Sequence, residues 1–210
     1  MGACNVPVDE WELDIVASGS QKGYMIPPGL SFVSMSDKAW EASKNSNLPK
    51  FYLNLKSYKK SLLNNSNPYT PAVNLIFALD ESLKMMKTEG LEKIFNRHER
   101  HKVAISKAAK TLNLKLFADE KHLSPAVTAI QIDDIDAEKF RKIIKNKYDI
   151  LLAGGQDHLK GKIFRIGHLG YINDRDIISV IAAIGNTLVE QNITSTEKAG
   201  EALKIASYYL

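Results

Sequence analysis

The sequence between residues 70 and 113 repeats apolar side chains at helical spacing, and this pattern constrains the fold more than any other feature. Thr70 followed by Pro71 is typical of a helix start, with a capping side chain and a proline at the first helical position. Gly90 divides the pattern in two. The second half places mostly apolar residues, with His98 among them, on one face with a 3.6-residue period: Leu91, Ile94, Phe95, His98, Ile105, Ala108, Ala109 and Leu112. The sequence therefore predicts two long, consecutive helices.

Shorter elements are expected on both sides of these helices. Residues 13–19 and 30–35 predict two strands, separated by a segment whose Pro27, Pro28 and Gly29 interrupt regular structure. Residues 43–69 are rich in Asn, Ser, Lys and Tyr and are expected to be irregular. The pattern after residue 113 predicts strands at 114–118, 126–132, 149–153 and 162–167, and helices at 136–147 and 173–191.

The expected starts of the last two helices also carry capping signals. Asn173 with Asp176 marks a helix start, and Thr194 with Glu197 has the pattern of a capping box. The tail that follows Thr194 is therefore expected to form an extra surface helix. Taken together, the elements predict an α/β fold with a compact α+β unit near the C-terminus.

Composition excludes several classes of function. The apolar runs are too short to span a bilayer, and no secretion signal begins the chain, so we expect a cytoplasmic protein that uses no membrane. Cys4 is the only cysteine, which excludes an internal disulfide and a cysteine-built metal site. The net charge of +4 comes from interspersed charges without a dense basic block, so no nucleic-acid partner is indicated.

Lys22 is the residue most suggestive of chemistry. It directly follows a predicted strand, lies among small residues and precedes the rigid turn at Pro27–Gly29. A neutral lysine amine in an apolar pocket is a nucleophile that forms Schiff bases, and loops at strand ends often carry active sites. From spacing alone, a solvated loop lysine is the commoner interpretation.

Three motifs favour a catalytic role for Lys22 over a solvated loop lysine. They are Ser-Gly-Ser-Gln-Lys-Gly at 18–23 with Pro-Pro-Gly-Leu at 27–30, Tyr-Thr-Pro-Ala at 69–72, and Phe-Arg-Ile-Gly-His-Leu-Gly at 164–170. In this order they resemble the class V aminotransferases, which are fold-type-I enzymes dependent on pyridoxal 5'-phosphate (PLP). The nearest branch contains the alanine–glyoxylate, serine–pyruvate and serine–glyoxylate aminotransferases. The resemblance spans residues 2–191 and leaves the tail from 193 outside.

The resemblance implies the C-terminal part of that fold: the last strands of the large-domain sheet, long linking helices and a small C-terminal α+β domain. Residues 1–90 would belong to the large PLP-binding domain and residues 91–113 to a linking helix. Residues 114–192 would form the small domain, and residues 193–210 an extra tail helix.

The same resemblance implies the roles of individual residues. Lys22 would bind PLP as a Schiff base and then move a proton between the substrate and the cofactor. Gln21 and Ser20 would bind the cofactor phosphate, and Thr70 would reach the phosphate of a neighbouring subunit, which implies a homodimer. Arg165 would bind the α-carboxylate of the substrate. The reaction would transfer an amino group between a small amino acid (serine or alanine) and a 2-oxo acid (glyoxylate or pyruvate).

Arg165 is also notable without the resemblance. It lies inside an apolar strand, and alternation puts its side chain on the same face as Ile163 and Gly167. An arginine in such a place is either paired with an acid, for example Asp149, or faces a cleft. Its planar fork suits a carboxylate because it donates two parallel hydrogen bonds.

Two further patterns are set aside. The glycines between Gly154 and Gly161 are similar to a phosphate-binding loop, but the spacing is one residue too long and Ile163 replaces the required hydroxyl residue. A turn between strands explains them. His98-Glu99-Arg100-His101 lacks the spacing of a zinc protease, so His98 is expected to be a packed, hydrogen-bonded side chain, and no metal site is predicted.

The chain begins later than the family pattern, whose preceding segment carries the phosphate-binding turn, a stacking aromatic residue and an aspartate for the ring nitrogen. We therefore expect a gene fragment, an alternative start at Met1 or a second chain that supplies the rest, with little activity from this chain alone. The competing functions are a non-catalytic subunit that dimerises through residues 70–113 and the small subunit of a soluble hydrogenase, a label carried by similar chains. Desulfuration by Cys4 is a weaker alternative, since Cys4 lies on the wrong side of Lys22.

Overall fold

The computed structural model describes residues 2–210 and divides them into two compact units. Unit 1 contains residues 6–88, and unit 2 contains residues 2–5 and 89–210. The division lies next to the boundary expected at residue 90. The expected linking helix and tail belong to the same unit as residues 114–192, while the assignment of residues 1–90 to the large domain of a parent fold stays a prediction.

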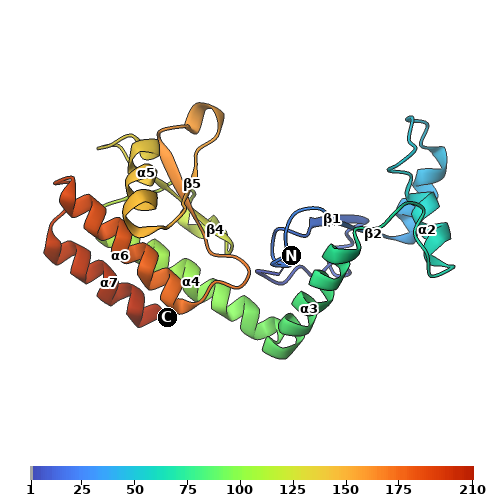
Figure 1. The fold of residues 1–210 in the computed structure, drawn as a ribbon, viewed down its shortest axis with the longest axis horizontal. Helices are drawn as coiled ribbons and strands as arrows, with labels where there is room; N and C mark the ends of the chain where they lie inside the picture. Colours follow the sequence, from blue (N-terminus) through green and yellow to red (C-terminus); the bar gives the residue numbers. More distant parts are fainter. Residues whose placement is uncertain (1) are drawn as a thin grey trace. The chain divides into compact units, whose positions relative to one another are not determined.

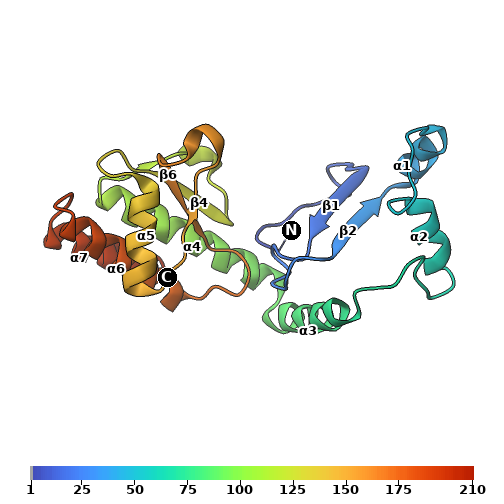
Figure 2. The same ribbon diagram turned by 45° about the horizontal axis from the view of Figure 1, so that its top comes forward.

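Unit 1 is built on an antiparallel pair of strands, β1 (Ile15–Gly19) and β2 (Ser31–Met35), visible in Figure 2. Among the described residues these two strands form a sheet by themselves. One face of the pair presents Ile15 and Val33 to solvent, with 61% and 46% of their surface exposed. The unpaired edges and open apolar face of this sheet agree with strands that belong to a larger sheet.

Helices follow β2 in unit 1. Ser36 caps α1 (Asp37–Ala42) by accepting a hydrogen bond from the Ala39 amide at 3.1 Å. The expected irregular segment contains a 3-10 turn, η1 (Ser43–Asn45), and α2 (Leu55–Leu62). The long helix α3 spans Val73–Glu89 and therefore begins three residues after Thr70. The prediction of a helix cap at Thr70 and a first-turn proline at Pro71 is wrong, because Ala72 accepts the first helical hydrogen bond, from the Ile76 amide.

Unit 2 begins with α4 (Leu91–Thr111), which continues into a four-stranded antiparallel sheet (Figure 1). The strand order is β3–β4–β6–β5. The bounds are Lys115–Leu116 for β3, Val127–Gln131 for β4, Ala153–Gly154 for β5 and Ile163–Gly167 for β6. The strands expected at 126–132 and 162–167 are confirmed, and β3 is a two-residue part of the strand expected at 114–118. The strand expected at 149–153 is wrong in its bounds, because β5 shares only Ala153 with it. Short 3-10 turns lie at Glu120–His122 (η2) and Asp157–Leu159 (η3).

The helices α5 (Ala137–Tyr148) and α6 (Asp174–Glu190) complete the predicted pattern of this unit. The helix start expected at Asn173 and Asp176 is confirmed, and it is a capping box: the side chain of Asn173 accepts from the Asp176 amide, and the side chain of Asp176 accepts from the Asn173 amide. The core lies between these helices and one face of the sheet, where the rings of Phe140 and Phe164 are 5.2 Å apart.

The tail helix α7 (Thr196–Tyr209) packs against α4 and α6. Its cap is Ser195, not the predicted Thr194, and its Ala199, Ala202 and Ala206 are buried in the core. The expected tail helix is therefore present, with one face exposed, and small residues at helical spacing on its other face let α7 approach its neighbours closely. None of the helices within residues 2–210 is both long and apolar enough to cross a membrane.

The packing of α7 predicts that Ala202→Leu destabilises unit 2. Ala202 is fully buried, so three extra carbons overpack the core, and a loss of about 1–3 kcal/mol is expected. Lys204→Leu places the same side chain on the exposed side of the helix and serves as the control. Native-state hydrogen exchange of α4 and α6 measures the difference, and equal protection in both variants would contradict a packed tail.

Candidate functional site

The segment that carries Lys22 is fastened at its base by Ser20. The Ser20 side chain is fully buried, and its hydroxyl donates to the Pro27 carbonyl at 2.8 Å and accepts from the Leu30 amide at 3.1 Å. The Ser20 amide also donates to the Leu30 carbonyl at 3.1 Å, which extends the pairing of β1 and β2 by one step. Residues 20–30 therefore form a closed loop, called the lysine loop below.

Lys22 lies in the tight turn that opens this loop. Its amide donates to the Gly19 carbonyl at 3.3 Å, and its carbonyl accepts from the Met25 amide at 3.0 Å. Met25 has a positive φ of 62°, a conformation that non-glycine residues adopt only when the surroundings impose it. The Lys22 side chain is exposed, and its amine makes no ion pair or hydrogen bond within residues 2–210. The backbone is thus fixed while the amine stays available.

Of the other residues predicted to bind the cofactor, Gln21 and Thr70 lie on the surface of unit 1, whereas Ser20 is buried. Gln21 is exposed, and its side chain folds back over Gly19, where an added Cβ would lie 2.8 Å from Oε1 of Gln21. Thr70 is also exposed and shares no hydrogen bond with the described lysine loop. Because both hydrogen-bonding functions of Ser20 serve the loop, its predicted contact with a phosphate stays a prediction.

Tyr69 fixes the segment that carries Thr70. Its hydroxyl donates to the Phe51 carbonyl at 3.1 Å, and its ring lies 4.6 Å from the ring of Tyr52. Phe51 and Tyr58 complete the aromatic cluster. Burial raises the pKa of Tyr58, with a further contribution from Tyr52. The four rings pack together the segment between β2 and α3.

Arg165 lies in unit 2, on the central strand β6. It pairs with Ala129 of β4 and Ala153 of β5, on the face opposite to the core residue Phe164. Its Nε donates to the Gly154 carbonyl at 2.9 Å. Within residues 2–210 no carboxylate pairs with it, so the alternative of an ion pair with Asp149 is not realised. The two terminal nitrogens of a positioned guanidinium remain available for a carboxylate.

The glycines that follow β5 serve the sheet. A Cβ on Gly155 would lie 2.1 Å from the Leu159 carbonyl oxygen, so the chain passes too closely for any side chain. After Gly161 the chain enters β6, whereas a phosphate-binding loop would lead into a helix. The interpretation of this segment as a turn between strands is confirmed.

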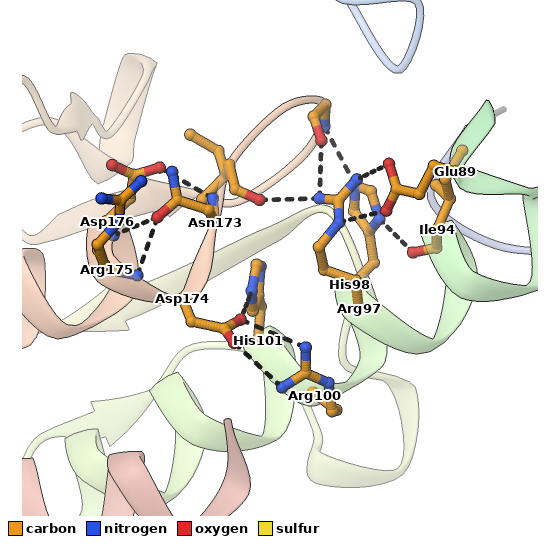
Figure 3. Close-up of polar contacts among 12 residues, drawn as sticks. Glu89, Ile94, Arg97, His98, Arg100, His101, Asn173, Asp174, Arg175 and Asp176 are labelled. Carbon is orange, nitrogen blue, oxygen red and sulfur yellow. Dashed lines mark hydrogen bonds and ion pairs between the residues drawn. The ribbon is translucent and has the colours of Figure 1, made fainter. Parts of the chain in front are cut away.

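A polar network joins α4 to the segment that leaves β6 (Figure 3). Arg97 pairs with both oxygens of Glu89 at 2.7 and 2.9 Å, and donates to the carbonyls of Gly170 and Ile172 at 2.9 and 2.8 Å. His98 donates through Nδ1 to the Ile94 carbonyl at 2.7 Å, so its Nε2 accepts from the Gly170 amide at 3.1 Å.

One turn further along α4, His101 and Arg100 both contact Asp174 at the start of α6, as Figure 3 shows. The expectation that His98 is a packed, hydrogen-bonded residue is confirmed. The partners of Arg97 and His101 were missed, although two Arg-His pairs three or four residues apart on one helix indicate a shared polar face.

Three histidines of unit 2 are fully buried: His98, His101 and His168. Burial lowers the pKa of His98 and of His101, and it lowers the pKa of His168 to about 4, with neighbouring His101 and His98 adding to the effect. The Nε2 of His168 bonds with the Thr128 hydroxyl at 2.9 Å. Within the described residues, no three His, Cys, Asp or Glu side chains are placed to hold a metal ion together.

Comparison with solved structures defines the class of this fold. The ureidoglycine–glyoxylate aminotransferase of Bacillus subtilis superposes with a TM-score of 0.88 and 30% identity, over 98% of this chain and 55% of that one. The chain therefore has the fold of the C-terminal part of the fold-type-I, PLP-dependent aminotransferases.

The sequence comparisons give the family. Residues 1–169 match the model described as aminotransferase class-V, and the chain belongs to that family. It is 55% identical over 203 residues to a protein of Synechococcus sp. (strain PCC 6716) named soluble hydrogenase, small subunit, covering 96% of this chain and 53% of the relative. It is 34% identical over 217 residues to the serine–glyoxylate aminotransferase of Methylorubrum extorquens, covering 100% and 54%. The chain thus spans about half the length of these relatives.

The buried histidines predict that unit 2 loses stability in acid. In the unfolded chain, His168 takes up a proton near pH 6.5, whereas in the folded unit its pKa is about 4. The free energy of unfolding therefore falls as the pH drops between these values. From about pH 7.5 to about pH 5, the free energy of unfolding should fall by on the order of 2 kcal/mol through His168 alone.

Native-state hydrogen exchange of α4 and β4, corrected for intrinsic rates, measures this loss. His168→Gln keeps a partner for Thr128 but removes the titration, so its pH dependence should be smaller than that of the unchanged chain. His158→Gln alters an exposed histidine and is the control. An unchanged pH dependence in His168→Gln would contradict the assignment.

Proposed function

We propose that this chain is the Lys22-bearing part of a PLP-dependent aminotransferase that moves an amino group between a small amino acid, such as serine or alanine, and a 2-oxo acid, such as glyoxylate or pyruvate. The observation that carries the proposal is the Lys22 amine, which is unpaired and exposed on a loop whose backbone is fixed. The names of two relatives, which both include glyoxylate and differ in the amino donor, support the choice of acceptor.

The Lys22 amine suits a cofactor that carries an aldehyde. A primary amine without an ion-pair partner would hold such a cofactor covalently, and the same amine, when free, would take the proton from the substrate Cα. PLP supplies the electron sink for the bond broken at that carbon. The turn around Lys22 holds the amine at the end of β1, so its backbone need not reorganise between these steps.

Arg165 supplies a site for the α-carboxylate that amino acids and 2-oxo acids share. Its terminal nitrogens donate two parallel hydrogen bonds to such a group, and the alanines beside it on β4 and β5 leave room for the ligand. Specificity for the side chain of the donor lies outside the contacts that these residues make.

We assign Gln21, Ser20 and Thr70 to the cofactor phosphate, with Thr70 acting in a neighbouring subunit of a homodimer. The exposed amide of Gln21 and the exposed hydroxyl of Thr70 support this role, because neither has a hydrogen-bond partner within residues 2–210. We place the protein in the cytoplasm, with no role for membrane or nucleic acid.

A non-catalytic, dimerising subunit is the second candidate, and α3 favours it. Several of its apolar side chains are exposed: Val73, Ile76, Phe77, Leu83 and Met85. All of these except Met85 share one face of the helix at helical spacing, and an apolar face of this kind fits a protein partner. The relative named as a hydrogenase subunit is compatible with such a role, whereas the single cysteine, Cys4, offers no thiolate set for iron–sulfur or nickel chemistry.

Covalent trapping distinguishes these candidates. The purified chain is mixed with a substoichiometric amount of PLP, reduced with borohydride and digested, and the modified lysine is located by mass spectrometry. Lys22 is expected to carry most of the label because its amine is exposed, unpaired and held by the loop. Lys22→Arg should abolish this label, whereas Lys59→Ala, a control at another exposed lysine, should not.

Label spread evenly over the lysines, with no dependence on Lys22, would contradict a cofactor role for this residue. The dimerising subunit would then be the better account, and sedimentation of the chain with Phe77→Ser would test it.

A further inference from the structure

The orientation of Arg165 depends on the strand that accepts its hydrogen bond. The acceptor is the Gly154 carbonyl of β5, at 2.9 Å from Nε. β5 is a two-residue edge strand, paired with β6 only, so its few ladder bonds hold it weakly. A shift of β5 would rotate the guanidinium plane of Arg165, because Nε is the nitrogen that fixes this plane.

A second arginine, on the opposite face of the sheet, holds the residue that directly precedes β5. Arg141 of α5 donates through Nε to the Leu152 carbonyl at 2.8 Å, and its NH1 pairs with Glu138 at 2.5 Å. Both side chains are partly buried. A Cβ on Gly154 would lie 2.4 Å from Oε1 of Glu138 and 2.5 Å from NH1 of Arg141. The ion pair therefore lies directly over the bare backbone of Gly154.

We propose that Arg141 is a positioning residue for Arg165, and that Glu138 and Gly154 complete this device. Arg141 anchors β5 beside α5, and the Gly154 carbonyl on β5 then sets the plane of the Arg165 guanidinium. Glycine is needed at position 154 because any side chain would displace the Glu138–Arg141 pair.

This arrangement determines how Arg165 can bind a ligand, an inference that rests on the proposed function. With Nε occupied by Gly154, a carboxylate can bind only end-on, to the two terminal nitrogens. Ala129 and Ala153 flank Arg165 on the neighbouring strands and add no charge or hydrogen-bonding group to the ligand site. The device therefore presents the two terminal nitrogens to a carboxylate, as on glyoxylate, from one approach direction.

Arginine side-chain NMR tests the proposal on the full chain without cofactor. The Nε–H signals are observed in ¹⁵N-arginine-labelled protein, and Arg165→Lys identifies the signal of Arg165. In the unchanged chain this proton should exchange slowly with water. Arg141→Lys keeps the charge but loses the hydrogen bond from Nε to Leu152, so exchange at Arg165 should rise by about tenfold.

Gly154→Ala is the second variant. Its added Cβ displaces the Glu138–Arg141 ion pair, at the flexible ends of both side chains, without mutating Arg141. It should accelerate exchange at Arg165 as Arg141→Lys does. Lys142→Ala, at an exposed neighbour on α5, is the matched control and should have no effect. Backbone amide spectra verify that each variant is folded.

Exchange at Arg165 that stays slow in both folded variants would overturn the positioning role. Titration with glyoxylate separates this outcome from the proposed function. A shift of the Arg165 signal in the unchanged chain, weakened in Arg141→Lys but not in Lys142→Ala, supports both. Faster exchange in the variants without any response to glyoxylate supports the positioning role and contradicts carboxylate binding.

Discussion

The hydrogen bonds of the Ser20 hydroxyl close the base of the lysine loop, and the remaining geometry of that loop depends on them. The hydroxyl joins the Pro27 carbonyl to the Leu30 amide from inside a fully buried position, so opening the loop breaks both hydrogen bonds and leaves the buried hydroxyl of Ser20 without its partners. The rigid turn at Pro27 and Pro28 shortens the path of the chain between these two partners of Ser20. Lys22 can therefore project its amine into solvent while its backbone stays fixed, which is the property that covalent chemistry requires.

Unit 2 restrains the Arg165 side chain through its strands. The proposed role of Arg165 needs free terminal nitrogens, yet a long side chain without partners would sample many rotamers. The unit fixes the strand instead: β4 and β5 flank β6, the core residue Phe164 anchors its other face, and Arg97 holds the segment that follows. The single bond from Nε to Gly154 then restrains the guanidinium without using its terminal nitrogens.

The parts of this arrangement that follow local periodicity were predictable. The 3.6-residue repeat placed α4, and the Asn173–Asp176 pattern placed the start of α6. Contacts that arise only from folding were not. The hydroxyl of Ser20 meets partners seven and ten residues away because β1 pairs with β2. The acceptor of the Arg165 hydrogen bond likewise depends on the order of the strands. The burial of α7 depends on packing against other helices, which the spacing of its alanines alone does not reveal.

The most direct test of this account links the Ser20 hydroxyl to the reactivity of Lys22. The measurement is the rate at which PLP and borohydride label Lys22 in Ser20→Ala, compared with Ser18→Ala, whose partly exposed hydroxyl has no hydrogen bond within residues 2–210. We predict a rate several-fold lower in Ser20→Ala, because the loss of the two hydrogen bonds lets the loop sample other conformations, and an unchanged rate in Ser18→Ala. Equal rates in both variants and in the unchanged chain would contradict the claim that the closed loop prepares Lys22 for its chemistry.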